Sequence, residues 1–215
     1  SGVDLIACAG YPWRIPVAAG GPRGLNVPPT LLPEGRGPLP FPHLILHGVQ
    51  AGGVTIHELA AHIDQGAILH QRPFPVLADD DYATLSRRSQ AVGREVLVEV
   101  LDDLDRFWEA RRPRTGGSWR PEPGEAARTL PLAGPLAAID RVARAFPPGE
   151  PIAVLDDLVR AVRSVVVWTD AHGRPPGSVV SERGDDALVA AADGYALLRL
   201  VPRRPAGRAL ARPPR

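Results

Sequence analysis

The pattern of apolar and polar positions in the first half of the chain predicts short strands. Residues 3–9, VDLIACA, form an apolar run that ends at Gly10 and Pro12, as a buried strand of an α/β sheet does. A second short run surrounds residues 25–27, and residues 54–57 have the β-branched composition of another strand. These runs favour a sheet near the start of the chain.

One long amphipathic helix follows these strands. Between residues 84 and 108 apolar side chains recur at spacings of three and four, and the candidate caps Asp79, Asp80 and Asp81 precede them. Prolines and glycines are so dense in residues 28–42 that we expect a shaped loop there and no helix.

The second half of the chain has a different pattern. Residues 136–146 predict a short amphipathic helix, after which glycines and prolines separate several short apolar runs. The predicted strands are 164–168, 178–181, 187–190 and 196–201. We therefore expect an α/β domain over residues 1–112, a linker over 113–128 rich in Pro, Gly and Arg, and a small β-rich barrel or sandwich over 129–215.

Composition narrows the class of protein. With 215 residues, 44% of them hydrophobic, the chain can bury a core, and its net charge of +1 gives no reason to expect a nucleic acid or an anionic membrane as partner. No apolar stretch is long enough to span a bilayer. The single Cys8 excludes an internal disulfide and a cysteine-cluster metal site, which agrees with a cytoplasmic location. All basic residues are arginine, as GC-rich bacterial coding favours.

An ordered set of residues between positions 26 and 69 resembles the folate-dependent formyltransferases, which include methionyl-tRNA and amino-sugar formyltransferases. The matching residues are Asn26-Val27, Leu31-Leu32-Pro33, Arg36-Gly37, Pro40, Gly48, Gly53-Val54-Thr55-Ile56-His57 and Asp64-Gln65-Gly66-Ala67-Ile68-Leu69. The resemblance implies a Rossmann-type α/β domain followed by a small β-rich domain.

The resemblance also implies a chemistry. Such enzymes move a formyl group from 10-formyltetrahydrofolate to an amine, and the formyl oxygen becomes negative on the way. In the family an asparagine and a histidine two residues later stabilise that oxygen, and an aspartate orients the histidine and carries the amine proton. The matching asparagine is Asn26 and the matching aspartate is Asp64, whereas Pro28 occupies the position of the histidine.

Pro28 removes one of these catalytic groups. Proline has no side-chain donor, no acid function and no backbone N–H. Loss of one oxyanion donor lowers turnover by roughly a hundred- to a thousandfold, and loss of the general acid removes about a further hundredfold. We expect ordinary transfer to be lost or altered. His43 or His62 is a candidate substitute proton carrier, against the simpler interpretation of solvated or structural histidines, and His57 is expected to be structural.

A folate site is implied as well. The matching segments, 11–15 and 54–64, hold the pteridine ring in the family, so a reduced folate such as 10-formyltetrahydrofolate is the expected ligand, with no metal. The candidate binding residues are Tyr11, Arg14, Ile15, Val54, Ile63 and Asp64. The alternative is that these segments only form core.

The start of the chain departs from the family. The family fold begins with three further strands before the one that residues 3–9 match, so we expect an N-terminally truncated domain whose open sheet edge a second copy or a partner chain covers. The expected acceptor is a small-molecule amine in one-carbon or specialised metabolism. Two other functions stay open: an enzyme that uses Asp64 as a base for a cyclisation or a hydrolysis, and a non-catalytic binding or scaffold subunit.

Overall fold

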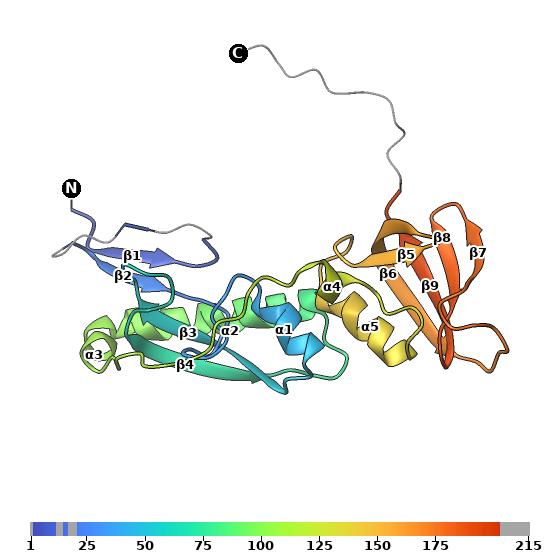
Figure 1. The fold of residues 1–215 in the computed structure, drawn as a ribbon. Helices are drawn as coiled ribbons and strands as arrows, with labels where there is room; N and C mark the ends of the chain where they lie inside the picture. The colour runs from blue at the N-terminus through green and yellow to red at the C-terminus, as the bar shows by residue number, and fades with distance from the viewer. Residues whose placement is uncertain (1, 12–14, 17–20, 203–215) are drawn as a thin grey trace, which may run out of the picture. The chain divides into compact units, whose positions relative to one another are not determined.

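The computed structural model describes residues 2–11, 15–16 and 21–202, and these form two compact units (Figure 1). The first unit comprises Ser1–Arg128 with Arg141–Pro147, and the second comprises Thr129–Asp140 with Pro148–Arg215. Residues 113–128, expected to be a linker, are therefore part of the first unit. The mixed α/β fold class with a β-rich second unit is the one that the sequence predicts.

The first unit is built on a sheet of four strands. They are β1 (Leu5–Cys8), β2 (Arg23–Asn26), β3 (Ala51–Glu58) and β4 (Ile68–Pro75), in the order β1-β2-β3-β4. β1 and β2 run parallel, while β2–β3 and β3–β4 are antiparallel. The pattern of polar and apolar residues did not predict β4, because its sequence ILHQRPFP has no clear alternation and contains two prolines. Its place at the edge of the sheet explains how a strand tolerates them.

β1 forms the other edge of this sheet. Leu5 to Cys8 pair with Arg23 to Asn26 of β2, and among the described residues no strand pairs with the outer side of β1. The expectation that a second copy or another chain covers this edge stays a prediction.

Two helices replace the single one expected over residues 84–108. α2 (Tyr82–Asp102) begins with a capping box in which the Asp81 carboxylate accepts from the Thr84 N–H at 2.7 Å, and it ends at Asp103, after which α3 (Leu104–Glu109) begins. The backbone of Asp103 has φ −142° and ψ 53°, outside the helical region, which breaks the helix. The buried face of α2 packs on β3 and β4 through Leu85, Val96 and Val100.

The expectation that residues 28–42 exclude a helix is wrong at its end. α1 (Pro40–Leu46) begins at Pro40 and also contains Pro42. Both prolines lie in the first turn, where the backbone N–H groups have no partner within the helix, so proline costs little there. Phe41, Leu44 and Ile45 of α1 are buried.

The Pro- and Arg-rich segment before the second unit lies against the loop that follows β2. Arg36 N–H donates to the Ser118 carbonyl at 3.1 Å, and Arg120 N–H donates to the Arg36 carbonyl at 2.7 Å. Gly117 and Gly37 permit this approach, because a Cβ on either would lie 2.0 Å from a carbonyl oxygen of the opposite segment. The segment is largely exposed, but backbone hydrogen bonds fix it to the first unit, and it ends in α4 (Glu125–Arg128).

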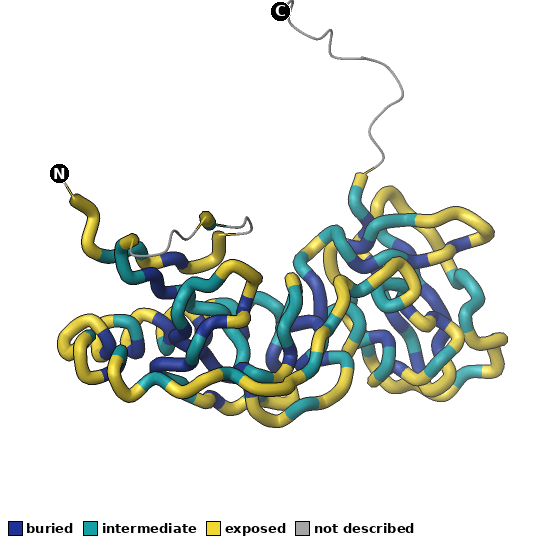
Figure 2. Tube along the Cα trace, turned by 60° about the vertical axis from the view of Figure 1, so that its left-hand side comes forward, coloured by how far each residue is buried: buried dark blue, intermediate teal, exposed yellow. Residues whose placement is uncertain are grey.

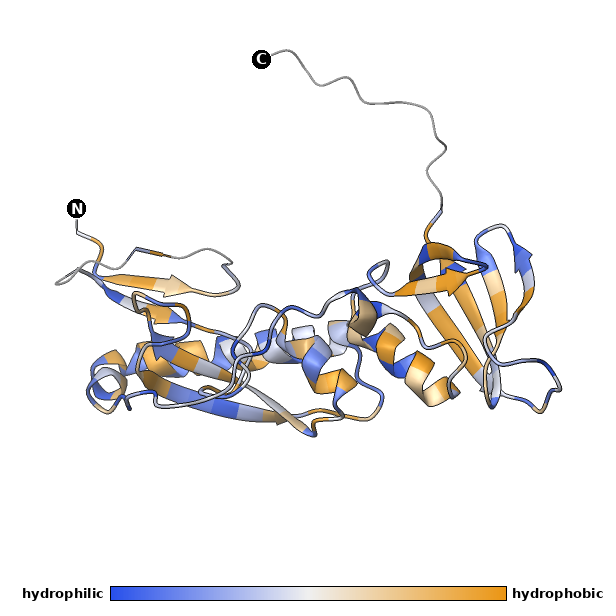
Figure 3. Ribbon diagram, viewed as in Figure 1, coloured by the Kyte–Doolittle hydropathy of each residue, from blue (hydrophilic) through white to orange (hydrophobic). Residues whose placement is uncertain are grey.

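The second unit is an antiparallel sheet of five strands. They are β5 (Ile152–Leu155), β6 (Leu158–Thr169), β7 (Val179–Arg183), β8 (Asp186–Ala190) and β9 (Gly194–Leu200), in the order β5-β6-β9-β8-β7. Its strands are largely apolar, and its buried residues lie mainly on β5, β8 and β9 (Figures 2 and 3). α5 (Leu136–Ala145), close to the predicted bounds, precedes the sheet in sequence; its residues up to Asp140 belong to this unit and those from Arg141 to the first.

β5 was not predicted, and β6 is longer than expected. Asp156 and Asp157 join the two strands with φ values of 46° and 64°. A two-residue hairpin with both residues at positive φ usually contains Asn-Gly or Asp-Gly, so Asp-Asp gave no turn signal. Across the described residues, no helix is long and apolar enough to cross a membrane.

Asp80 generates a prediction about acid stability. Its carboxylate is 3% exposed and accepts from the Leu77 N–H, the Thr84 hydroxyl and the Arg88 guanidinium. Burial alone would raise the pKa of Asp80, but the hydrogen bonds from Arg88, Leu77 and Thr84 outweigh it and hold the pKa below its ordinary value. Folding therefore gains stability from ionised Asp80 above about pH 4 and loses it as the pH falls further.

We expect Asp80→Asn to lower the free energy of unfolding at pH 7 by about 1 to 3 kcal/mol and to flatten its decline below pH 4. Urea unfolding between pH 2 and 7 measures both effects. Asp79→Asn, at an exposed neighbour, is the control. Equal acid dependence in the two variants would contradict this role of Asp80.

Candidate functional site

Three polar side chains from separate segments of the first unit meet at one point. Asn26 ends β2, His57 lies opposite it in β3, and Asp64 lies in the turn between β3 and β4. The Asn26 amide nitrogen Nδ2 is 3.2 Å from His57 Nε2 and donates to Asp64 Oδ1 at 3.3 Å. His57 Nε2 and Asp64 Oδ1 are also 3.3 Å apart. The site is a triangle of one amide, one imidazole and one carboxylate.

The hydrogen-bond partners of His57 decide how its ring is used. Nδ1 lies 2.7 Å from the Glu58 carbonyl oxygen, which only accepts, so Nδ1 carries the hydrogen. Nε2 therefore faces Asn26 and Asp64. In the neutral ring Nε2 accepts from the Asn26 amide, and in the protonated ring it donates to Asp64. His57 is 1% exposed and Asp64 8%, so both depend on these partners for their polar contacts.

The backbone between β3 and β4 holds Asp64 in place. The β3–β4 register shifts between Ile56 and His57, a bulge of the kind that changes the direction of a side chain at functional sites. Asp64 has φ 54°, a left-handed conformation that Asp tolerates better than most residues. At Gly66 the turn passes so close to β3 that a Cβ would lie 1.7 Å from the Glu58 carbonyl oxygen.

The triangle lies in the wall of a pocket of about 580 Å³. Aromatic and proline side chains form much of that wall, and two of the aromatic residues, Tyr11 and Trp119, are 56% and 57% exposed. Trp119 comes from the segment that is hydrogen-bonded to the loop after β2. Pro28 is also in the wall, two residues after Asn26, the last residue of β2. A volume of this size and a mainly apolar lining are usual for sites that bind a small molecule.

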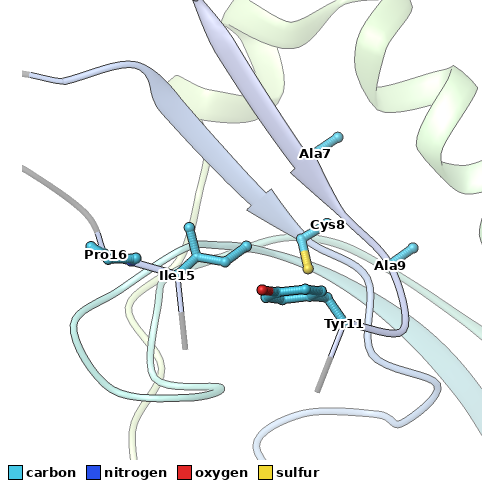
Figure 4. A pocket seen from close by; sticks show the side chains of 6 residues that line it. All are labelled: Ala7, Cys8, Ala9, Tyr11, Ile15 and Pro16. Carbon is cyan, nitrogen blue, oxygen red and sulfur yellow. The ribbon is translucent and has the colours of Figure 1, made fainter. Parts of the chain in front are cut away.

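A second, shallower pocket of about 460 Å³ adjoins β1 (Figure 4). Figure 4 shows the Cys8 sulfur pointing toward the Tyr11 ring, with Ile15 beside them. Because Cys8, Tyr11 and Ile15 line both pockets, the two form neighbouring parts of one recess in the first unit.

The structure brings together most of the residues expected to bind a ligand. Tyr11, Ile15, Ile63 and Asp64 line the larger pocket. Val54 does not reach it, since it is 1% exposed and packs in the core with Phe41, Phe74 and Leu85. Arg14 lies outside the described residues.

The histidines separate into different environments. His43 lies on α1, outside the pocket lining, where burial first and then the nearby Arg120 and His47 lower its pKa to about 4. It is therefore neutral at pH 7 and a poor replacement for a protonated histidine. His62 lines the pocket and is exposed. Nowhere in the described ranges do three His, Cys, Asp or Glu side chains form a group that could hold a metal ion.

His57 is the site residue that sequence reasoning assigned to structure alone. Every residue of β3 from Gly52 to His57 is buried, so alternation along the strand does not distinguish a site residue from a core residue. Only the pairing of Asn26 with His57 across β2 and β3 brings the ring to the pocket.

Comparison with known proteins gives a consistent family. Residues 1–101 match the formyl transferase family. The chain is 29% identical to the methionyl-tRNA formyltransferase of Chromobacterium violaceum over 194 aligned residues. This alignment covers 89% of this chain and 63% of the relative. It is 32% identical to the methionyl-tRNA formyltransferase of a Roseiflexus species over 221 aligned residues. This alignment covers 96% of this chain and 64% of the relative. The chain thus spans less than two thirds of the length of these curated relatives.

A solved structure supports the fold. HypX from Aquifex aeolicus, crystallised in complex with tetrahydrofolic acid, superposes with a TM-score of 0.75 and 20% identity over 91% of this chain and 35% of HypX. At this identity the likeness is one of fold.

Gly66 tests how the turn holds the site. We expect Gly66→Ala to lower the free energy of unfolding by about 1 to 3 kcal/mol, because its methyl group would collide with the Glu58 carbonyl. Gly124→Ala is the matched control, since no atom lies within 4 Å of a Cβ there. Urea unfolding of both variants measures the difference. If the two lose equal stability, the close approach of the turn to β3 is not a constraint.

Proposed function

We propose that this chain, whose residues 1–101 match the formyl transferase family, binds a reduced folate in its larger pocket and serves a slow formyl transfer to a small-molecule amine. The observation that carries this proposal is the convergence of the Asn26 amide and the Asp64 carboxylate within 3.3 Å in the wall of that pocket. These are a donor and a proton acceptor, two of the groups that such a transfer uses.

The roles follow from the chemistry of each group. The folate, when bound, supplies the formyl group. Asn26 donates an amide hydrogen to the formyl oxygen, where negative charge develops, and Asp64 accepts the proton that the attacking amine loses. Because both side chains lie against one pocket, each is within reach of a ligand held there.

Two features of the site oppose fast transfer. Pro28 lines the pocket but offers only its carbonyl, which already accepts from the Thr55 N–H at 3.2 Å. In addition, the Asn26 amide has two hydrogens, and with neutral His57 both have partners within the chain, His57 Nε2 and Asp64 Oδ1. Asn26 must release one of them before it can stabilise an oxyanion.

The pocket also suits a flat heterocycle. Its volume of about 580 Å³ is in the usual range for small-molecule sites, and Tyr11, Phe41, Tyr82 and Trp119 contribute aromatic surface to it. HypX, which shares the fold, was crystallised with tetrahydrofolic acid. The proposal includes a reducing, cytoplasmic location, for which an unpaired Cys8 is suited.

We expect formyl transfer by the unaltered chain at well below roughly one turnover per second, because Pro28 cannot act as a general acid. Incubation with 10-formyltetrahydrofolate and a panel of amines, with tetrahydrofolate release followed over time, measures it. Pro28→His is expected to raise the rate at least tenfold, whereas the control Pro121→His, at an exposed position outside the pocket, leaves it unchanged. Fast transfer by the unaltered chain would refute the assigned effect of Pro28.

Folate binding is expected despite slow catalysis, because it uses pocket residues other than Pro28. Titration calorimetry with tetrahydrofolate should give a dissociation constant below about 1 mM, and Tyr11→Ala should weaken binding at least threefold. Trp168→Ala removes an exposed aromatic side chain in β6 of the second unit and serves as control. If millimolar folate produces no binding heat and no thermal stabilisation of the chain, the result favours a scaffold function instead.

A further inference from the structure

We propose that His57 and Asp64 act as one proton-holding pair that takes over the work of the histidine excluded by Pro28. The proposal rests on the proposed formyl transfer and assigns a role to a residue whose position in β3 had suggested a structural one. Its basis is the 3.3 Å separation of His57 Nε2 and Asp64 Oδ1 in the wall of the pocket.

The ring of His57 is oriented for this role. The Glu58 carbonyl takes the Nδ1 hydrogen, so the other nitrogen, Nε2, points at the site. An imidazole fixed in this way can gain and lose a proton at Nε2 without turning, which a proton carrier requires. The oriented nitrogen touches only two side-chain partners that the structure describes, Asn26 and Asp64.

The neighbouring ionisable side chains have other partners or lie elsewhere, so they do not compete for the contact between His57 and Asp64. The Glu58 side chain, the nearest other carboxylate along β3, is turned to Arg111 at 3.3 Å. His43, one of the two candidate carriers named from the sequence, has its pKa lowered to about 4, first of all by burial, and lies outside the pocket lining. Of the histidines in the wall, His62 is exposed and has solvent as a competing partner, whereas His57 is 1% exposed.

Protonation of His57 also changes what Asn26 can do. With neutral His57, one Asn26 amide hydrogen is donated to Nε2 and the other to Asp64. Once Nε2 carries a proton, it donates to Asp64 and no longer accepts from Asn26. One amide hydrogen of Asn26 is then released toward the pocket, where it can donate to the formyl oxygen. The same proton thus prepares both the acid and the oxyanion donor.

The proton balance of the transfer closes with this pair. The amine nitrogen forms a bond to the formyl carbon, and the bond from that carbon to the departing nitrogen breaks. The amine gives one proton to the pair at Asp64, and the pair returns one proton to the departing nitrogen. The pair ends with the number of protons that it held at the start, and no oxidant or further reactant is needed.

Kinetics test the catalytic part of the proposal. His57→Gln should lower kcat for tetrahydrofolate release at least tenfold, while the dissociation constant of tetrahydrofolate, measured by calorimetry, changes by less than threefold. His43→Gln is the matched control, expected to leave both values unchanged. Should His57→Gln unfold, which thermal denaturation would reveal, His57→Asn replaces it. A folded His57 variant with unaltered kcat overturns the proposal.

Nitrogen NMR tests the pairing without reference to catalysis. In the unaltered chain at pH 7, long-range 1H–15N spectra should show His57 with its hydrogen on Nδ1. Asp64→Asn should shift the Nε2 resonance of His57, and His43→Gln should not. An unmoved Nε2 resonance in Asp64→Asn overturns the pair. The unaltered chain could bind folate and yet release tetrahydrofolate from 10-formyltetrahydrofolate no faster than buffer alone. In that case the proposed transfer fails, and the NMR spectra alone decide whether His57 and Asp64 form a pair.

Discussion

The site depends on one cross-strand pair, Asn26 of β2 opposite His57 of β3. Antiparallel pairing brings directly opposite residues within about 5 Å of each other, so the amide and the imidazole come into contact as a consequence of register. The bulge beside His57 and the narrow turn at Gly66 then bring the Asp64 carboxylate to the same point. A shift of one residue in this register would turn His57 to the other face of the sheet.

A second framework fixes the loop that contains Pro28. Thr55 is fully buried, and its hydroxyl donates to the Thr30 carbonyl at 2.7 Å while it accepts from the Leu32 N–H at 3.1 Å. Gln71 of β4 adds hydrogen bonds to the Leu32 carbonyl and the Thr55 hydroxyl. None of these bonds needs a side chain at position 28. The loop therefore keeps its shape with proline where the family chemistry would use histidine.

The chain also closes its pocket with a segment remote in sequence. Residues 118–120 hydrogen-bond to Arg36 and so bring Trp119 to the pocket wall, and the glycines at 37 and 117 allow the two backbones to touch. A segment with the composition of a linker thus becomes part of a site. Its backbone hydrogen bonds can form because glycine leaves no side chain between the two backbones at these positions.

The sequence by itself determined the class of fold, the long helix with its acidic cap and the positions of Asn26, Pro28 and Asp64, because periodicity, capping and motif spacing are local properties of the chain. It did not reveal β4, β5, the start of α1 or the break at Asp103. There, edge position, first-turn geometry or a single backbone conformation outweighs the local pattern. Only the tertiary structure decided that His57 joins the site and that Val54 belongs to the core. The reason is physical: side-chain function here depends on which residue lies opposite across the sheet, and strand register is set by contacts between segments far apart in sequence.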